Sequence, residues 1–293
     1  MPYGGGQSGM GGTSGMILSL PEHNEELVTV VREKKARNRD INIVSPFAGK
    51  SFCFRDWAKS LKAMPVDRAH VLVYDNSNSK TFGRKLDEFC KKELAAYTLC
   101  RDTNPHLTME FSNNWTAIGK RCRAVYGIIY NELVDQKRTW CLNLEDDIGA
   151  PNDSWEKLSF IMKDESVGTA IGKCIDRRGL NDRGVRLPIA VNFTRTQTIG
   201  PTGIKAEPRI ELEHIPEKDY GVEAIGGGHM GLWLTRTEAI RSLGMGHQFG
   251  EIVGNDMNWG YAINEAGWKF AHDWSIHMKH YYKDKQSGKK LSC

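Results

Sequence analysis

An apolar segment that runs directly into three acidic residues constrains this chain more than any other feature. Segment 140–144 has the composition of a strand that is buried on both faces. It is followed at once by Glu145, Asp146 and Asp147. Clustered carboxylates repel one another and lose hydration on burial, so a cation has to neutralise them. Because open α/β sheets bind ligands just outside the carboxyl ends of their strands, the segment predicts a divalent cation and an anionic ligand there.

Apolar segments and helical patterns alternate along the first half of the chain. Apolar residues spaced at i, i+3, i+4 and i+7 from Phe54 predict a helix that stops before Pro65. Alternation of this kind predicts a parallel sheet with right-handed crossovers. We expect strands at 41–45, 69–75, 97–101 and 139–144, with helices near 54–61, 82–95 and 115–133. Beyond these we expect a helix near 154–163, a strand near 168–175, a turn-rich stretch over 176–223, a strand at 230–234, helices from 237 and over 255–266, and a strand over 268–274.

The two ends of the chain are expected to lie outside the packed domain. Residues 1–15 contain seven glycines and almost nothing to bury, which predicts a flexible tail. The polar stretch 21–40 is interpreted as a solvated helical face or linker in preference to a nucleic-acid arm. We therefore expect a glycine-rich tail and polar lead-in over 1–40, a single domain over 41–282 and a basic tail over 283–293.

Composition bounds the class of protein. The 293 residues are 40% hydrophobic and 26% charged, which is typical of soluble globular proteins. No apolar run approaches the roughly 18 residues of a membrane span, and we find no secretion signal, so we expect a cytoplasmic location. The net charge of +4 permits an anionic partner without requiring one. Seven cysteines without CxxC spacing predict reduced thiols in a cytosolic compartment, not a disulfide framework or a zinc site.

Three further motifs each have an ordinary and a functional interpretation. Asp75 and Asn76 end the second expected strand and could grip a nucleotide, although an Asx turn is favoured for the pair taken alone. The run Gly226–Gly228 is either a flexible turn or a backbone that approaches a substrate closely. Asp256 opens a helix, where it is either a charge favoured by the helix dipole or a general base. Sequence alone leaves these alternatives open.

Taken in order, these segments resemble the GT-A fold glycosyltransferases, in particular the large inverting family 2-like group, over residues 41–282. The stretch 144–147, with Pro151 just after it, is similar to the DxD motif of that family. The other matching segments are Ser45-Pro46 with the helix after it, 73–77, 114–130, Gly226–Gly228, Asn255-Asp256 and the run from Gly267 to His280. The resemblance implies a GT-A-like, Rossmann-like α/β fold. In it, a mostly parallel sheet is flanked by helices, 41–150 binds the nucleotide-sugar and 151–282 forms a mixed acceptor half.

The resemblance also implies a role for each site residue. Asp147 would be the metal ligand, with Mn²⁺ or Mg²⁺ as the cofactor, and Asp256 would be the catalytic base. His280 would be a further metal or diphosphate contact, with His277 as the alternative if the strand register differs. The residues implied in donor binding are Ser45, Pro46, Asp75, Asn76, Glu145, Asp146, Gly227 and Gly228.

The chain departs from the family pattern at three places. Glu145 stands where the family usually has aspartate, and Asn255 stands where it often has glutamate. The arginine often found shortly after the catalytic aspartate is missing, because residues 259–262 occupy that region. These departures bear on the donor contact and on recognition of the acceptor or diphosphate.

The implied activity is inverting transfer of a sugar from a UDP- or similar nucleotide-sugar to an acceptor hydroxyl. The acceptor-facing candidates are Arg177, Arg178, Arg183, His229 and Trp259. A hydroxymethylated base in DNA is the expected acceptor, as in a bacteriophage-type DNA-modifying enzyme acting in the host cytoplasm. A glycan or lipid-linked acceptor is the alternative within the class. A metal-dependent nuclease, a non-catalytic nucleic-acid-binding module and a nucleotidyltransferase are the alternatives outside it; for the last, 47–50 is a faint phosphate-loop pattern.

Overall fold

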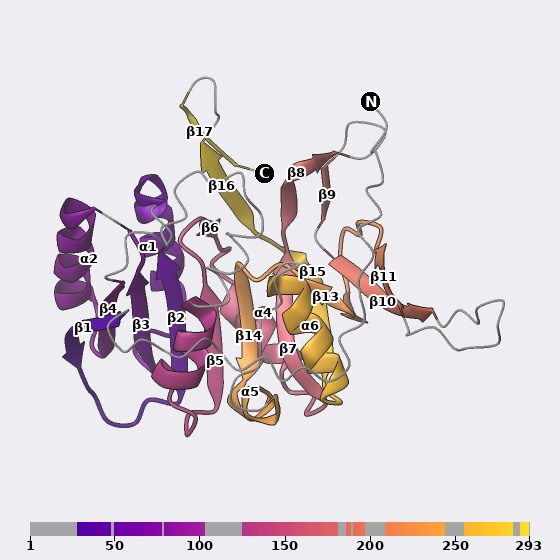
Figure 1. Cartoon of the computed structure of the whole chain (residues 1–293), viewed down its shortest axis with the longest axis horizontal. Coiled ribbons are helices and arrows are strands. Elements are labelled where there is room, and N and C mark those ends of the chain that lie inside the picture. Colours follow the sequence, from indigo (N-terminus) through magenta and orange to yellow (C-terminus); the bar gives the residue numbers. More distant parts are fainter. Residues whose placement is uncertain are drawn as a thin grey trace.

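The computed structural model describes residues 28–47, 50–77, 79–102, 125–180, 186–188, 190–196, 209–243, 255–283 and 288–292. Within these ranges a nine-stranded sheet forms the middle of the protein, with helices packed against it (Figure 1). The strand order is β1-β4-β3-β2-β5-β14-β7-β15-β12. In that order the bounds are Val28–Lys34, Tyr97–Asp102, Ala69–Asp75, Ile41–Phe47, Trp140–Leu144, Leu232–Arg236, Val167–Lys173, Lys269–His277 and Val222–Ile225.

Most strands of this sheet run in one direction. Strands β4, β3, β2 and β5 pair in parallel, and β15 pairs in parallel with β7. Strand β14 is antiparallel to both β5 and β7, so β7 and β15 share the direction of β5. In the described sheet, β1, β12 and β14 run the other way. The predicted α/β class, with a mostly parallel sheet flanked by helices and a mixed C-terminal half, is confirmed.

Strands β2 and β5 pair in parallel, so their carboxyl ends lie side by side, and we call the region just beyond these two strand ends the crevice. From β2 the chain passes through α1 (Phe54–Lys62) to β3, which pairs with one edge of β2. Strand β5 pairs in parallel with the other edge of β2. Open α/β sheets bind ligands at the carboxyl ends of two such neighbouring strands, where the strand order reverses. Residues that follow β2 and β5 are therefore placed where a ligand would bind.

The alternation of side chains along β2 explains why both faces of the sheet are covered. Ile43 belongs to one buried cluster, which also contains Trp57 of α1 and residues of α2 (Lys80–Glu93) and α4 (Ser154–Ile161). Val44, the next residue, belongs to the cluster on the opposite face. That cluster includes residues of a π-helical turn (Ile129–Leu133), α5 (Thr237–Ser242) and α6 (Asn255–Glu265). Successive side chains of a strand point to opposite faces, so an unbroken apolar strand requires a layer on each side.

The smaller elements pair in three further sheets within the described residues. Strand β10 (Ala190–Thr196) lies between β11 (Arg209–His214) and β13 (Gly227–Gly228), and β16 (Lys279–Lys283) lies between β6 (Ile148–Gly149) and β17 (Lys290–Ser292). Strand β8 (Ile175–Leu180) pairs with β9 (Arg186–Pro188), and a 3₁₀ helix covers Ser51–Cys53. The turn-rich stretch expected over 176–223 is therefore wrong, because β8 to β12 lie there. Strand pairing satisfies the backbone N–H and C=O groups of these segments. Their sequence is too polar to show the apolar pattern that would have predicted strands.

A second difference lies at the N-terminal edge of the sheet. Part of the expected polar helical face or linker, residues 28–34, forms β1 and pairs antiparallel with β4. Val30 and Val31 remain exposed on this edge strand. β-branched residues favour extended backbone even where little of the side chain is buried. The basic residues that follow make the segment as a whole polar, so its sequence did not indicate a strand. Residues 1–27, and with them most of the expected tail, lie outside the described residues.

Two expectations drawn from composition can be compared with the described residues. Five cysteines of the described ranges are free thiols, as predicted: Cys53, Cys90, Cys100, Cys141 and Cys174. Among the helices described, none combines the length and the hydrophobicity that a membrane span requires.

A close contact at Gly260 gives a stability prediction. A Cβ atom on this α6 residue would lie 2.4 Å from the carbonyl oxygen of Gly226 and 2.4 Å from the Cα of Gly227. Backbone atoms cannot move aside as a side chain can, so we expect Gly260→Ala to lower the free energy of unfolding by about 1–3 kcal/mol. Gly127 is the matched control, since no atom of the described residues lies within 4 Å of its Cβ position. Gly127→Ala should be neutral or stabilising by about 0.5–1 kcal/mol, and urea unfolding of both variants measures the difference.

Candidate functional site

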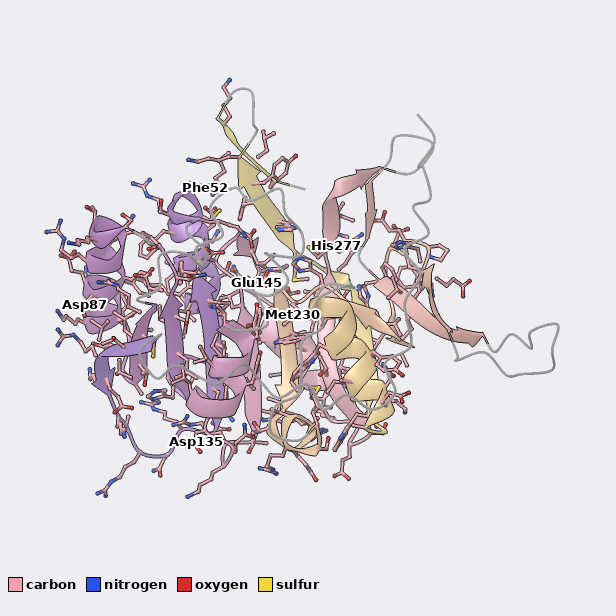
Figure 2. All side chains as sticks on the ribbon, in the orientation of Figure 1. Phe52, Asp87, Asp135, Glu145, Met230 and His277 are labelled. Carbon is pink, nitrogen blue, oxygen red and sulfur yellow. The ribbon has the colours of Figure 1, made fainter. Side chains whose placement is uncertain are left out.

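The acidic triplet lies at the carboxyl end of β5, inside the crevice between β2 and β5. Figure 2 labels Asp135, which precedes β5, near the bottom of the view, and Glu145, which follows β5, higher up. The 3₁₀ helix that opens the connection from β2 begins one residue after Lys50. Lys50 and the triplet therefore approach the crevice from neighbouring parallel strands.

Lys50 pairs with two buried carboxylates at this point. The side chains of Asp146 and Asp147 are 2% and 0% exposed, whereas that of Lys50 is 26% exposed. The Lys50 ammonium donates to Asp147 Oδ2 at 2.5 Å and lies 3.7 Å from Asp146 Oδ1. The Lys50 backbone N–H also donates to Asp146 Oδ2, at 3.3 Å. We call Lys50, Asp146 and Asp147 the acidic corner. Buried charges need a partner of opposite sign, and Lys50 is one such partner.

The acidic corner remains electrostatically negative toward its surroundings. The pKa of the Cys53 thiol is raised to about 12, chiefly by burial and then by the carboxylates of Asp147 and Asp146, while Lys290 and Lys50 lower it. A thiol pKa rises when nearby negative charge opposes formation of the thiolate. The corner is therefore suited to holding additional positive charge.

Strand β16 holds the acidic corner from another side. Its residue His280 is paired in register with Ile148, and the Tyr281 backbone N–H donates to Asp147 O at 2.8 Å. The His280 Nε2 atom lies 3.1 Å from Asp147 Oδ2. His277, the alternative metal contact, is exposed at the end of β15. Of the two histidines, the structure places His280 beside Asp147.

Glu145 faces a different partner from its two acidic neighbours. The Tyr126 hydroxyl donates to Glu145 Oε1 at 2.7 Å. Tyr126 stacks on Tyr130, with ring centroids 6.0 Å apart, and Tyr130 stacks on Trp259 of α6 at 5.3 Å. This aromatic stack links the acidic triplet to the first half of α6.

Trp259 itself is a core residue, and its predicted acceptor-facing role is wrong. Its side chain is 1% exposed and lies 4.5 Å from the Trp233 ring, measured between centroids. The Trp259 indole N–H donates to Thr169 Oγ1 at 3.2 Å. A tryptophan that packs on both sides of the ring and has its N–H satisfied by the protein is not available to an acceptor.

Asp75 forms the Asx turn that its sequence favours, and it also forms an ion pair. Its Oδ1 accepts from the Ser77 backbone N–H at 2.9 Å, and its Oδ2 lies 3.2 Å from Arg101 Nε. Gly83 of α2 allows this pair, since a Cβ there would lie 1.7 Å from the Arg101 guanidinium. The Asn76 backbone N–H donates to Phe47 O at 2.9 Å. A role of Asp75 and Asn76 in donor binding stays a prediction.

Ser45 and Pro46 lie on β2 just before the crevice. The Ser45 hydroxyl is buried, donates to Leu144 O at 2.8 Å and accepts from the Trp57 indole N–H at 3.0 Å. This hydroxyl links β2, β5 and α1 below the acidic corner. Contact of Ser45 or Pro46 with a donor stays a prediction.

The predicted glycine loop is buried against α6. Gly227 and Gly228 form β13, which pairs with Ala190 and Val191 of β10. The absence of side chains here lets the backbone approach Gly260 of α6, as described above. The structure thus gives these glycines a packing role, and contact with a donor stays a prediction.

Three of the remaining candidates have side chains that the structure does not describe. Asp256 is the second residue of α6, and Arg177 and Arg178 lie in β8. Arg183 lies outside the described residues. Their predicted catalytic and acceptor-facing roles therefore rest on the sequence.

His229, a predicted acceptor-facing residue, instead lies in a buried cluster. It meets Cys174 and His280, and the potential ligand atoms of the three side chains all lie within 4.8 Å of one another. All three residues are buried. Cys174 was missed by sequence reasoning, because no spacing relates it to either histidine. Lys50 was noted only in a faint phosphate-loop pattern.

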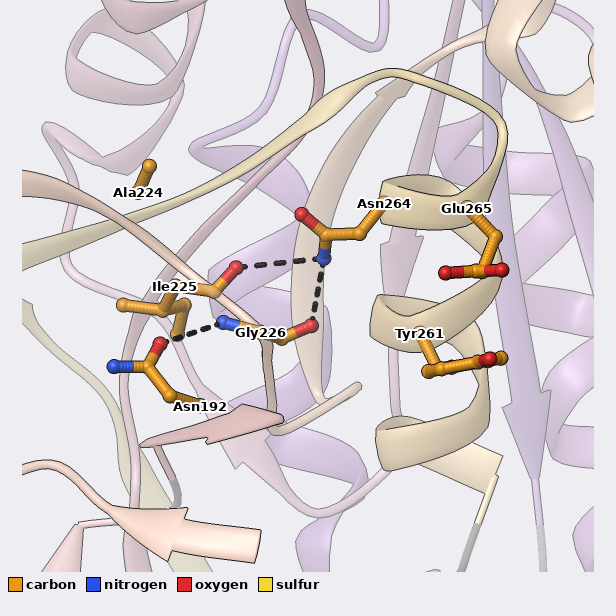
Figure 3. A pocket seen from close by; sticks show the side chains of 7 residues that line it. All are labelled: Asn192, Ala224, Ile225, Gly226, Tyr261, Asn264 and Glu265. Atoms are coloured by element: carbon orange, nitrogen blue, oxygen red, sulfur yellow. Dashed lines mark hydrogen bonds between the residues drawn. The ribbon is translucent and has the colours of Figure 1, made fainter. Parts of the chain in front are cut away.

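A separate pocket of about 560 Å³ lies between α6 and the 224–226 segment (Figure 3). The Asn192 side chain accepts from the Gly226 backbone N–H at 3.1 Å, and Asn264 donates to Gly226 O at 2.9 Å. These amides are therefore engaged in holding the pocket wall together. Its lining residues are Asn192, Ala224, Ile225, Gly226, Tyr261, Asn264 and Glu265.

Comparison with known proteins gives distant structural likenesses. No protein-family model matches the chain, and no curated protein sequence matches it. It is similar to the mannosyltransferase PcManGT from Pyrobaculum calidifontis in complex with GDP-Man and Mn²⁺, with 13% identity, a TM-score of 0.49, and 88% of this chain and 61% of that chain covered. The chain thus spans less than two thirds of that protein.

Two further solved structures have similar TM-scores. A197 from STIV has 10% identity and a TM-score of 0.44, with 86% of this chain and 93% of that chain covered. The 4-diphosphocytidyl-2C-methyl-D-erythritol synthase from Anaerococcus prevotii DSM 20548 has 8% identity and a TM-score of 0.44, with 87% and 93% covered. At this distance none of them assigns a role to an individual residue, so the chemistry has to come from the geometry of the site.

Proposed function

We propose that this protein is a metal-dependent glycosyltransferase that uses a nucleotide-sugar donor. One observation carries the proposal: two buried carboxylates, Asp146 and Asp147, and the ammonium of Lys50 converge between β2 and β5, where the strand order reverses. A site with both signs of charge in such a crevice suits a diphosphate and a divalent cation together.

The residues present fit a divalent cation. Asp146 and Asp147 offer the carboxylate oxygens that Mn²⁺ and Mg²⁺ prefer, and two buried carboxylates face the single ammonium of Lys50. Lys50 would have to withdraw from Asp147, which its partly exposed, flexible side chain permits. A bound cation would supply charge stabilisation for the departing nucleoside diphosphate.

Each residue of the site then has a distinct task. Asp147 holds the cation, and His280 keeps the Asp147 carboxylate in place through their 3.1 Å contact. Lys50, displaced from Asp147, contacts a phosphate of the donor. Asp256, at the start of α6, removes the proton from the acceptor hydroxyl as it attacks the anomeric carbon, and the configuration inverts.

The proposed acceptor is a hydroxyl on a modified base in DNA. Its support is the set of arginines around 177–195 in a chain of net charge +4. A glycan acceptor makes the opposite prediction, because its binding would be insensitive to salt. Gel-shift assays at two salt concentrations, with hydroxymethylated duplex and with neutral glycan, separate the two acceptors.

A thermal-shift screen of nucleotide-sugars with and without Mn²⁺ tests the donor and the cation. A donor present at 100 times its Kd adds about 2.7 kcal/mol of stability. We expect one nucleotide-sugar to raise Tm by roughly 5 °C with Mn²⁺ and by much less with EDTA. Failure of every nucleotide-sugar to stabilise the protein in the presence of Mn²⁺ would refute the proposal.

A nucleotidyltransferase is the second candidate, and the position of Lys50 favours it. This lysine follows the first parallel strand of the crevice and reaches the acidic residues with both its backbone N–H and its ammonium. In phosphate loops a lysine that follows a strand contacts the phosphates of the bound nucleotide, a contact that Lys50 could make once it leaves Asp147. The two activities differ in product, since this enzyme would release pyrophosphate from a nucleoside triphosphate, whereas a glycosyltransferase releases a nucleoside diphosphate.

A further inference from the structure

Three buried side chains with metal-binding atoms meet beside the acidic corner. They come from the end of β7 (Cys174), from the segment before β14 (His229) and from β16 (His280). We propose that these three residues form a site for a thiophilic divalent ion such as Zn²⁺. It is separate from the cation position at Asp146 and Asp147, and it does not depend on the proposed glycosyl transfer.

The donor set determines which ion fits. A thiolate and two imidazoles suit zinc, whereas Mg²⁺ and Mn²⁺ favour oxygen ligands. Around a tetrahedral zinc ion, sulfur and nitrogen ligands lie about 3.3–3.6 Å from one another. The ligand atoms of Cys174, His229 and His280 already lie within 4.8 Å of one another. Closing the site therefore needs shifts on the order of 1 Å.

Asp147 prepares His280 for this role. The Asp147 carboxylate is fully buried and lies 3.1 Å from His280 Nε2, so that nitrogen donates its proton to the carboxylate. With Nε2 facing the carboxylate, Nδ1 is the ring nitrogen that would bind the metal. A carboxylate that accepts from one ring nitrogen while the other binds metal is a recurrent arrangement at zinc sites. His280 would thus contact the Asp147 carboxylate through one ring nitrogen and bind the metal through the other.

His229 is the weaker of the two imidazole ligands. Its Nδ1 accepts from the Gly231 backbone N–H at 2.7 Å, and its ring centroid lies 4.9 Å from that of His280. Binding through Nδ1 would give up the Gly231 hydrogen bond, and binding through the Cys174 thiolate would give up the weaker Sγ contact with Ile175 O at 3.9 Å. The Cys174 thiol loses its proton to solvent as the metal–sulfur bond forms.

Cobalt substitution tests the site on the full-length chain. We expect the metal-stripped protein, kept reduced by a reductant that is not itself a thiol, to bind Co²⁺ with a thiolate-to-metal charge-transfer band in the near ultraviolet. Zn²⁺ should displace this Co²⁺ and abolish the band. Cys174→Ala should remove the band and weaken binding beyond the roughly 100-fold loss typical of outer-sphere changes. Asp147→Asn should retain the band and weaken binding about 10–100-fold. His229→Gln should weaken binding less than Cys174→Ala does.

Cys90→Ala is the matched control, because Cys90 is a buried free thiol on α2. It should bind Co²⁺ as the unaltered chain does. Absence of the charge-transfer band when the unaltered chain binds Co²⁺, or a band that survives Cys174→Ala, would overturn the proposal. If Cys174→Ala does not fold, the test is made on the unaltered chain. Removing bound metal with a chelator should lower its Tm, and adding Zn²⁺ but not Mg²⁺ should restore the Tm. Neither result changes the donor screen with Mn²⁺, so the two proposals can fail separately.

Discussion

Asp147→Asn should abolish sugar transfer, with kcat reduced by at least about 10³-fold. The substitution preserves the size and shape of a fully buried side chain but removes its charge. A cation contributes several kcal/mol of charge stabilisation in the transition state, and each 1.4 kcal/mol corresponds to about a factor of ten in rate. The Tm increase caused by Mn²⁺ together with the donor should vanish as well, because both depend on the Asp147 oxygens.

Activity assays and thermal-shift measurements on the same preparation check both expectations. Asp67→Asn is the matched control, since Asp67 is an exposed aspartate outside the crevice. It should behave as the unaltered protein. Normal turnover by Asp147→Asn would place the cation elsewhere. Loss of transfer with Mn²⁺-dependent donor binding retained would make Asp147 a positioning residue and not the metal ligand.

The strand end at Leu144 shows what the sequence can predict. An apolar segment followed by acidic residues has few physical solutions, and the structure has the predicted strand, β5, with Asp146 and Asp147 buried at its end. The directions of β2, β3, β4 and β5 follow from the alternation of strands and helices. Local patterns and connection rules suffice for this part of the fold.

Lys50 shows why the partners of a site are harder to predict. It lies 97 residues from Asp147 in sequence, and the two meet only because β2 and β5 pair. Cys174, His229 and His280 come together from three separate segments for the same reason, so the absence of CxxC spacing said nothing about them. Trp259 failed in the opposite sense, since α6 buries it against Tyr130 and Trp233. A polar-flanked tryptophan looks the same in sequence whether it faces a substrate or a core.

The aromatic stack also bears on Asp256, whose replacement has the second largest expected effect. Asp256 precedes Trp259 by one helical turn, and Trp259 is connected through Tyr130 and Tyr126 to Glu145. The first turn of α6 is therefore held at a fixed position relative to the acidic triplet. The positive end of the helix dipole favours the ionised carboxylate that a general base requires.

We expect Asp256→Asn to lower kcat by about 10²–10⁴-fold, the range typical of general acid–base catalysis, while the Mn²⁺-dependent donor shift is retained. Glu265→Gln, at the exposed last turn of the same helix, is the control and should leave kcat unchanged. Loss of donor binding together with transfer would assign Asp256 a structural role at the start of α6. Unchanged transfer would mean that another group takes the acceptor proton. The catalytic base would then have to be identified separately from the cation site, because Asp147 would be the only one of the two aspartates with a role at the acidic corner.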